Sequence, residues 1–322
     1  MLFEKKILNI YRSQFFSRCD DTGLAHYFSA ADFPGLRQQA LPFPSSLGHT
    51  LQGWLYCYEE IIPGRLVVFD HGLGGGHRSY MKEIEKLCRH GYLVFAYDHT
   101  GCMASGGENT RGLAQSLVDL KDCLKALKAT PGIGDLDISV VGHSWGAYAA
   151  MNIPAFYPEI SHIVAMSGYI SVEAMARQFF TGILGGYRKP VLRLEQAANP
   201  DFVHYDAVHT LSETGANVLL IYSANDKIVN REMHHDVLKK ALAGKKNIRI
   251  ILEQNKGHNP NYTADAAAYL GQFTGELARK LKDGTLKTDA QKQAFRNHWD
   301  WDRMTAQDEN VWKEIFHTLD SE

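Results

Sequence analysis

A serine between two closely spaced glycines directly follows an apolar run near the middle of the chain. The run covers residues 138–141, and the next five residues, 142–146, read GHSWG with Ser144 at the centre. This G-x-S-x-G pattern is typical of a sharp strand-to-helix turn that exposes a nucleophilic serine. Glycine suits both flanks because a Cβ would clash there with the crowded backbone. Since the short pattern also occurs by chance, the rest of the chain must supply what a serine nucleophile needs.

A serine hydroxyl is a poor nucleophile at neutral pH, so it requires a base, and the base requires an orienting acid. With this kind of turn, the partners come in the chain order Ser, Asp or Glu, His, each just after a later strand. Asp226 follows the apolar run 217–222, and His258 follows the run 248–252. We therefore predict a catalytic triad of Ser144, Asp226 and His258.

Two other aspartates compete for the role of the orienting acid. Asp206 lies in a segment where the alternation of strands and helices lapses, and Asp236 lies inside a predicted helix over residues 231–242. Neither directly follows a predicted strand, which favours Asp226.

A glycine-rich stretch is the candidate source of donors for a developing oxyanion. Residues 70–77 read DHGLGGGH and follow the apolar run 65–69. We predict that the backbone N–H groups of Leu73 and Trp145 form the oxyanion hole. A phosphate cradle is the alternative, but the stretch lacks G-x-G-x-x-G and a P-loop lysine, so we expect no cofactor and no metal.

The elements that must position these residues alternate along the chain. Apolar runs that predict strands cover residues 51–58, 65–69, 92–97, 138–141, 162–166, 217–222 and 248–252. Helices are predicted over residues 81–90, 147–156 and 231–242, and along a leucine stripe from Leu113 to Leu127. From the third run onward the strands are continuously apolar, which indicates a mostly parallel sheet covered on both faces. The sequence predicts an α/β class with a doubly wound sheet, whose ligands bind at the carboxyl ends of the strands.

We expect one domain over residues 1–322, with three additions. Residues 1–32 form an N-terminal helical segment, which packs on its own domain or, alternatively, binds a membrane surface. Residues 169–211 form a cap or lid insertion, with a packed excursion that has no gating role as the alternative. Residues 283–322 form a C-terminal helical extension that packs on the domain, and a homo-oligomer contact there is left open.

The composition narrows the class of partner. Lys and Arg number 34 and Asp and Glu number 36, so the net charge is −2 without long runs of one sign. This argues against a nucleic-acid partner. The five cysteines include no C-x-x-C pair, and no apolar run approaches the ~20 residues of a membrane span. We expect a cytoplasmic protein with no integral membrane segment.

Several short motifs in the same order resemble one superfamily. They lie at residues 44–55, 71–75, 91–98, 142–146, 226–229 and 257–258. Together they resemble the α/β-hydrolase superfamily, within it the serine hydrolases related to monoacylglycerol lipases and serine aminopeptidase-like esterases. The resemblance implies the α/β-hydrolase fold and an acyl-enzyme mechanism without a cofactor. Relatives carry Asp-x-Arg-Gly-x-Gly-x-Ser where residues 98–105 read DHTGCMAS, which puts the wall of the pocket in question.

The predicted function is hydrolysis of a small-molecule carboxylic ester, or of an amide, by a serine esterase. An acyltransferase would use the same triad with an alcohol or amine in place of water. A non-catalytic binding protein on the same scaffold is the third hypothesis, although such proteins usually lose a triad residue and none is missing here.

Overall fold

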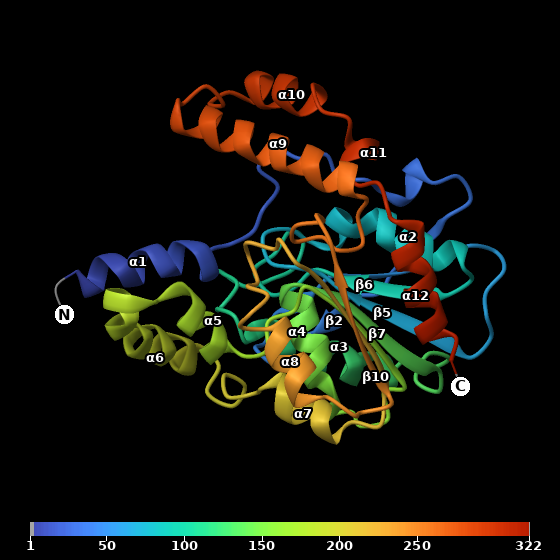
Figure 1. Ribbon diagram of the computed structural model, residues 1–322. Coiled ribbons are helices and arrows are strands. Elements are labelled where there is room, and N and C mark those ends of the chain that lie inside the picture. The colour runs from blue at the N-terminus through green and yellow to red at the C-terminus, as the bar shows by residue number, and fades with distance from the viewer. Residues whose placement is uncertain (1–2, 322) are drawn as a thin grey trace.

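The computed structural model describes residues 3–321. Met1, Leu2 and Glu322 lie outside the described residues, and with them the first two positions of the predicted N-terminal segment. A twisted sheet runs through the centre, and helices cover both of its faces (Figure 1).

The central sheet has eight strands in the order β1-β4-β6-β5-β7-β8-β9-β10. Their bounds are β1 Arg37–Ala40, β4 Gly53–Cys57, β5 Arg65–Asp70, β6 Leu93–Tyr97, β7 Asp137–His143, β8 His162–Met166, β9 Asn217–Ser223 and β10 Ile248–Glu253. Strands β6, β5, β7, β8, β9 and β10 are parallel, whereas β1 and β4 form an antiparallel edge. A separate hairpin pairs β2 (Phe43–Pro44) with β3 (Thr50–Leu51). Each of the seven predicted runs contains a strand, and the predicted mostly parallel sheet is confirmed.

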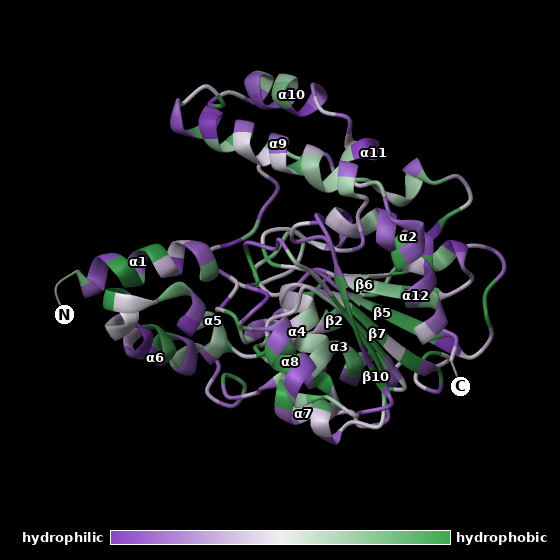
Figure 2. Ribbon diagram, in the orientation of Figure 1, coloured by the Kyte–Doolittle hydropathy of each residue, from purple (hydrophilic) through white to green (hydrophobic). Residues whose placement is uncertain are grey.

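Alternate side chains of the central strands enter two different cores. In β5, Leu66 and Val68 pack on one face, while Val67 and Phe69 pack on the other, and all four are fully buried. The first face is covered by α3 (Gln115–Lys128), α4 (Trp145–Asn152) and α8 (His235–Ala241), and the second by α2 (Met81–Arg89) and α12 (Glu309–Leu319). Figure 2 accordingly shows the central strands as mainly hydrophobic, unlike the outer helix α10 (Asp289–Asn297). Burial on both faces explains why the strands read as unbroken apolar runs.

Two predicted helices are shorter than expected. The helix after the serine, predicted over residues 147–156, begins at Trp145 and ends at Asn152, where a 3₁₀ turn (Ile153–Ala155) follows. Pro154 has no N–H to donate, so the α-helical ladder cannot continue through it. The helix predicted over residues 231–242 covers only His235–Ala241, because the preceding residues form turns.

The insertion after β8 is helical. It contains α5 (Val172–Phe179), η4 (Gly182–Tyr187), α6 (Arg188–Ala198) and α7 (Ala207–Glu213). The N-terminal helix α1 (Glu4–Phe15) lies beside α6, where the Tyr11 hydroxyl donates to Glu195 Oε1 at 2.6 Å (Figure 1). Helix α1 therefore packs on the insertion. Gating by the insertion stays a prediction.

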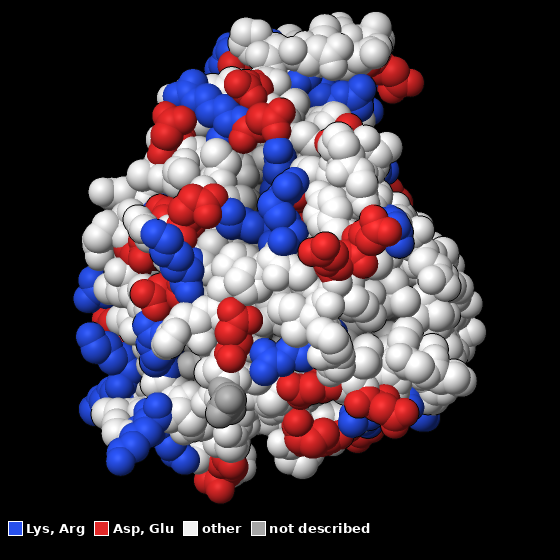
Figure 3. Space-filling view, turned by 90° about the vertical axis from the view of Figure 1, so that its right-hand side faces the viewer, with Lys and Arg blue, Asp and Glu red and all other residues white. Residues whose placement is uncertain are grey.

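The C-terminal part contains two different packings. Helix α12 buries Val311, Trp312, Ile315 and Leu319 against the sheet. Helices α9 (Ala264–Lys282), α10 and α11 (Trp301–Met304) instead share a small cluster around Phe273 and Trp299, and α9 and α10 stand away from the sheet (Figure 1). Among residues 3–321, no helix is long and apolar enough to cross a membrane. Basic and acidic side chains are interspersed over the face shown in Figure 3.

Candidate active site

Ser144 occupies a strained turn between β7 and α4. Its φ is 55° and its ψ is −107°, a conformation that non-glycine residues rarely adopt. A Cβ at Gly142 would lie 2.5 Å from the Gly146 oxygen, and a Cβ at Gly146 would overlap the backbone oxygen of Asp70. Both glycines are therefore required by close packing, and the turn presents the serine at the start of a helix.

The structure brings the three predicted triad residues together. His258 Nε2 lies 2.8 Å from Ser144 Oγ, and His258 Nδ1 lies 2.8 Å from Asp226 Oδ2. Because the carboxylate accepts from Nδ1–H, Nε2 is free to accept the serine proton. Asp226 follows β9 and His258 lies in the loop after β10, so each side chain is placed by the carboxyl end of its strand.

One protein family and one curated protein resemble part of this chain. The family model for serine aminopeptidase, S33, matches residues 62–210. A monoglyceride lipase homolog of Monkeypox virus is 28% identical over 131 residues, which cover 38% of this chain and 46% of that protein. The chain thus spans about half the length of this curated relative.

Solved structures resemble the chain over more of its length. An esterase from Pyrococcus furiosus has a TM-score of 0.58 at 20% identity and covers 83% of this chain and 98% of its own. An acetyl xylan esterase from Paenibacillus sp. R4 has a TM-score of 0.55 at 16% identity. The match covers 80% of this chain and 88% of that esterase. An α/β hydrolase from Penicillium sp. sh18 has a TM-score of 0.52 at 17% identity. The match covers 76% of this chain and 97% of that hydrolase. These likenesses show that the chain has the α/β-hydrolase fold.

The carboxylate of Asp226 is held in its ionised form. Burial acts to raise the pKa of Asp226, but the hydrogen bond and charge of His258, together with two backbone N–H groups, outweigh it, and the net pKa is lowered. Asp226 Oδ1 also accepts from the N–H groups of Ile228 at 2.8 Å and Val229 at 3.1 Å. The Asp226 side chain is 1% exposed and that of His258 is 21% exposed, so the imidazole is the more accessible partner.

The two rival aspartates have other partners. Asp206 caps α7 by accepting from the Val208 N–H at 2.8 Å. Asp236 lies on the surface beside Arg231 and His235. His258 is therefore oriented by Asp226, the carboxylate that sequence position favours.

The predicted oxyanion donors lie on the loop after β5 and at the first residue of α4. Within residues 3–321, the backbone N–H groups of Leu73 and Trp145 have no hydrogen-bond acceptor. Trp145 N–H is one of the orphan donors at a helix N-terminus, where the dipole favours an anion. Both N–H groups are thus available to a ligand.

A hydrogen-bonded chain links the glycine-rich loop to the histidine loop, and sequence reasoning did not find it. The Gly72 N–H donates to Tyr80 Oη at 3.1 Å, and the Tyr80 hydroxyl donates to His143 Nδ1 at 2.8 Å. His143 Nε2–H then donates to the His258 backbone oxygen at 2.8 Å. Burial and the nearby His258 lower the pKa of His143 to about 3, so this imidazole is neutral. Tyr80 lies 63 positions before His143, and no spacing rule connects them.

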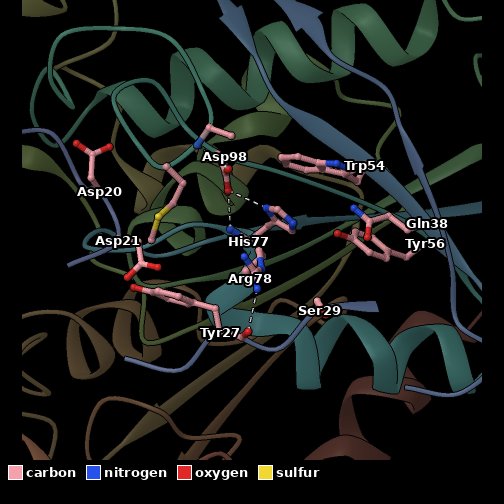
Figure 4. A pocket seen from close by; sticks show the side chains of 12 residues that line it. Asp20, Asp21, Tyr27, Ser29, Gln38, Trp54, Tyr56, His77, Arg78 and Asp98 are labelled. Atoms are coloured by element: carbon pink, nitrogen blue, oxygen red, sulfur yellow. Dashed lines mark hydrogen bonds and ion pairs between the residues drawn. The ribbon is translucent and has the colours of Figure 1, made fainter. Parts of the chain in front are cut away.

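A cavity of about 550 Å³ lies beside the glycine-rich loop, and none of its lining residues belongs to the triad (Figure 4). Trp54, His77, Asp98 and Met103 are among the side chains that line it. Asp98 Oδ1 accepts from the His77 backbone N–H at 2.9 Å and lies 2.8 Å from His77 Nδ1. The loop that departs from the family pattern therefore forms a wall of this cavity.

Proposed function

We propose that the chain hydrolyses carboxylic esters through a covalent acyl-enzyme. The observation that carries the proposal is the unbroken chain of hydrogen bonds from Ser144 through His258 to Asp226, with the serine held in a strained turn. The resemblance to esterases and to a monoglyceride lipase homolog supports the same chemistry.

In the first half of the proposed reaction, Ser144 Oγ attacks the carbonyl carbon of the acyl group while His258 Nε2 takes the serine proton. The carbonyl oxygen becomes an oxyanion that accepts from the N–H groups of Leu73 and Trp145. The tetrahedral intermediate collapses to the acyl-enzyme as His258 returns the proton to the departing alcohol. Asp226 stabilises the imidazolium throughout this half.

In the second half, water replaces the alcohol. His258 takes a proton from the water as its oxygen attacks the acyl carbon, and the acid leaves when Ser144 regains its proton. Esters react more readily than amides because an alkoxide leaves more easily than an amide anion, so we propose an ester as the main substrate class.

Replacement of the nucleophile tests this proposal. Ser144→Ala should lower kcat for a nitrophenyl acylate by about 10⁴–10⁶-fold and abolish labelling by a fluorophosphonate probe. The exposed Ser13→Ala is the matched control and should behave as wild type. Wild-type turnover by Ser144→Ala would refute the proposal. Ester products in place of free acid, in assays with added alcohols, would identify an acyltransferase instead.

A further inference from the structure

Three ionisable side chains with no exposed surface meet next to the serine turn. Asp70 ends β5, His99 follows β6, and Asp119 lies in α3. His99 Nδ1 lies 3.1 Å from Asp119 Oδ2, and His99 Nε2 is in ion-pair contact with Asp70 Oδ1. Both ring nitrogens face carboxylate oxygens, an arrangement that fits the imidazolium, the form of the ring in which both nitrogens donate.

Further hydrogen bonds hold the cluster in place. Asp119 also accepts from the Thr100 N–H at 2.8 Å, the Thr100 hydroxyl at 2.7 Å and the Gln115 side-chain amide at 2.8 Å. Burial acts to lower the pKa of His99, but the two carboxylates outweigh it and raise this pKa to about 9. A buried charge paired on both sides is costly to break, so the cluster resists rearrangement.

The cluster contacts the segment that carries the first oxyanion donor. The His99 backbone N–H donates to His71 Nε2 at 3.0 Å, and His71 Nδ1–H donates to the Gly72 oxygen at 2.8 Å. Gly72 immediately precedes Leu73. The position of this loop is thereby coupled to the residue that follows β6.

The same cluster contacts the segment that carries the second donor. The rings of His99 and Trp145 have centroids 4.6 Å apart. Asp70 pairs with Gly142 in the sheet, and its backbone oxygen leaves no space for a Cβ at Gly146. The His99 ring therefore lies against a side chain of each donor segment, His71 before Leu73 and Trp145 itself.

We propose that His99 is a positioning residue, whose imidazolium, clamped between Asp70 and Asp119, fixes the spacing of the Leu73 and Trp145 N–H groups. This inference rests on the proposed hydrolase function. An oxyanion hole acts by preorganised geometry, so a change in donor spacing weakens transition-state binding more than substrate binding.

The test compares two substitutions of buried histidines. His99→Gln should lower kcat for a nitrophenyl acylate about 10–100-fold with KM within twofold of wild type. The inhibition constant of a trifluoromethyl ketone, which forms a tetrahedral oxyanion adduct with the serine, should rise by the same factor. His162→Gln is the matched control, because His162 is also buried and, within residues 3–321, its ring hydrogen-bonds to Ser139, Ser161 and the Ser321 backbone oxygen. It lies at the start of β8, at the opposite end of the strand from the serine turn. This substitution should lower Tm and leave kcat and the inhibition constant within twofold.

Asp70→Asn provides a second test that keeps the shape of the side chain. It should show the same parallel loss in kcat and inhibitor affinity, and it carries the test alone if His99→Gln fails to fold. A folded His99→Gln or Asp70→Asn variant with wild-type kcat and inhibitor affinity would overturn the role of His99. Failure of the proposed function looks different, because Ser144→Ala would then retain activity and the ketone would not inhibit the wild type.

Discussion

Apart from the His99 cluster, the carboxyl edge of the sheet carries the aspartate–histidine pairs Asp226–His258 and Asp98–His77, and of these His258 contacts a serine. Asp226 and His258 follow β9 and β10, while Asp98 follows β6 and pairs with His77 at the end of the glycine-rich loop. In both pairs the histidine Nδ1 lies 2.8 Å from the carboxylate. The carboxylate–imidazole contact alone therefore does not distinguish a catalytic pair from a structural one.

The other side of each imidazole makes the difference. His258 Nε2 faces Ser144 Oγ, and the His258 side chain is 21% exposed. His77 is 3% exposed, and its ring stacks on Trp54 with centroids 4.1 Å apart. Asp98 also accepts from the His77 backbone N–H, so this pair fastens a loop. A general base needs an accessible nitrogen within hydrogen-bond distance of a nucleophile. A pair that holds a loop in place instead needs burial and hydrogen bonds to the backbone.

The largest expected effect comes from the proposed catalytic pair, Asp226 and His258. Asp226→Asn should lower kcat by about 10⁴-fold, because the amide favours the wrong imidazole tautomer and no longer stabilises the imidazolium. Steady-state kinetics measure this effect. Asp236→Asn, in the rival surface aspartate, should keep wild-type kcat. A loss of less than tenfold in Asp226→Asn would place the orienting acid elsewhere.

A substitution in the Asp98–His77 pair should mainly lower the stability of the fold. Asp98→Asn leaves two buried donors with a weaker acceptor and should lower the free energy of unfolding by about 1–3 kcal/mol, measured in urea. We expect kcat to fall about tenfold, through the glycine-rich loop that Asp98 holds. A loss in kcat equal to that of Asp226→Asn, in a protein of wild-type stability, would give both pairs the same kind of role.

A substitution in the hydrogen-bonded chain between the glycine-rich loop and His258 should lower kcat by a smaller factor. Tyr80→Phe removes the hydroxyl that accepts from Gly72 and donates to His143. Each of these two hydrogen bonds is worth about 1 kcal/mol, so kcat should fall about fivefold if the energy of one of them appears in the transition state. Unchanged kcat with a lower Tm would show that this chain supports the fold alone.

Glu195 is a buried carboxylate without an imidazole partner. We expect its titration to change the stability of the fold but not kcat. Burial raises the pKa of Glu195 to about 7, so the folded state binds a proton that the unfolded state releases above about pH 4.5. The contribution of this group to stability is therefore present below pH 4.5 and falls by about 3 kcal/mol as pH rises to 7.

Glu195→Gln tests this by urea unfolding at several pH values. The variant should flatten the decline in stability between pH 4.5 and 7 without changing kcat. A pH profile identical to that of the wild type would show that Glu195 does not titrate in this range.

The sequence predicted the parts of the site that depend on strand ends. Ser144, Asp226 and His258 each follow an apolar run, and parallel strands bring their carboxyl ends to one edge. Tyr80, His143 and His99 could not be predicted in the same way, because their roles depend on side-chain contacts between residues 20 to 115 positions apart. Asp98, like Asp226, lies in the loop after a strand, and only the structure shows that its histidine lacks a serine.

The contact between Tyr11 and Glu195 joins residues 184 positions apart, which matters for how the chain is made. At ordinary synthesis rates of about 5–20 residues per second, α1 leaves the ribosome roughly 10–40 s before α6 does. During that interval its apolar face has no partner from the insertion. Helix α1 can therefore reach its position on α6 only after the insertion has been translated.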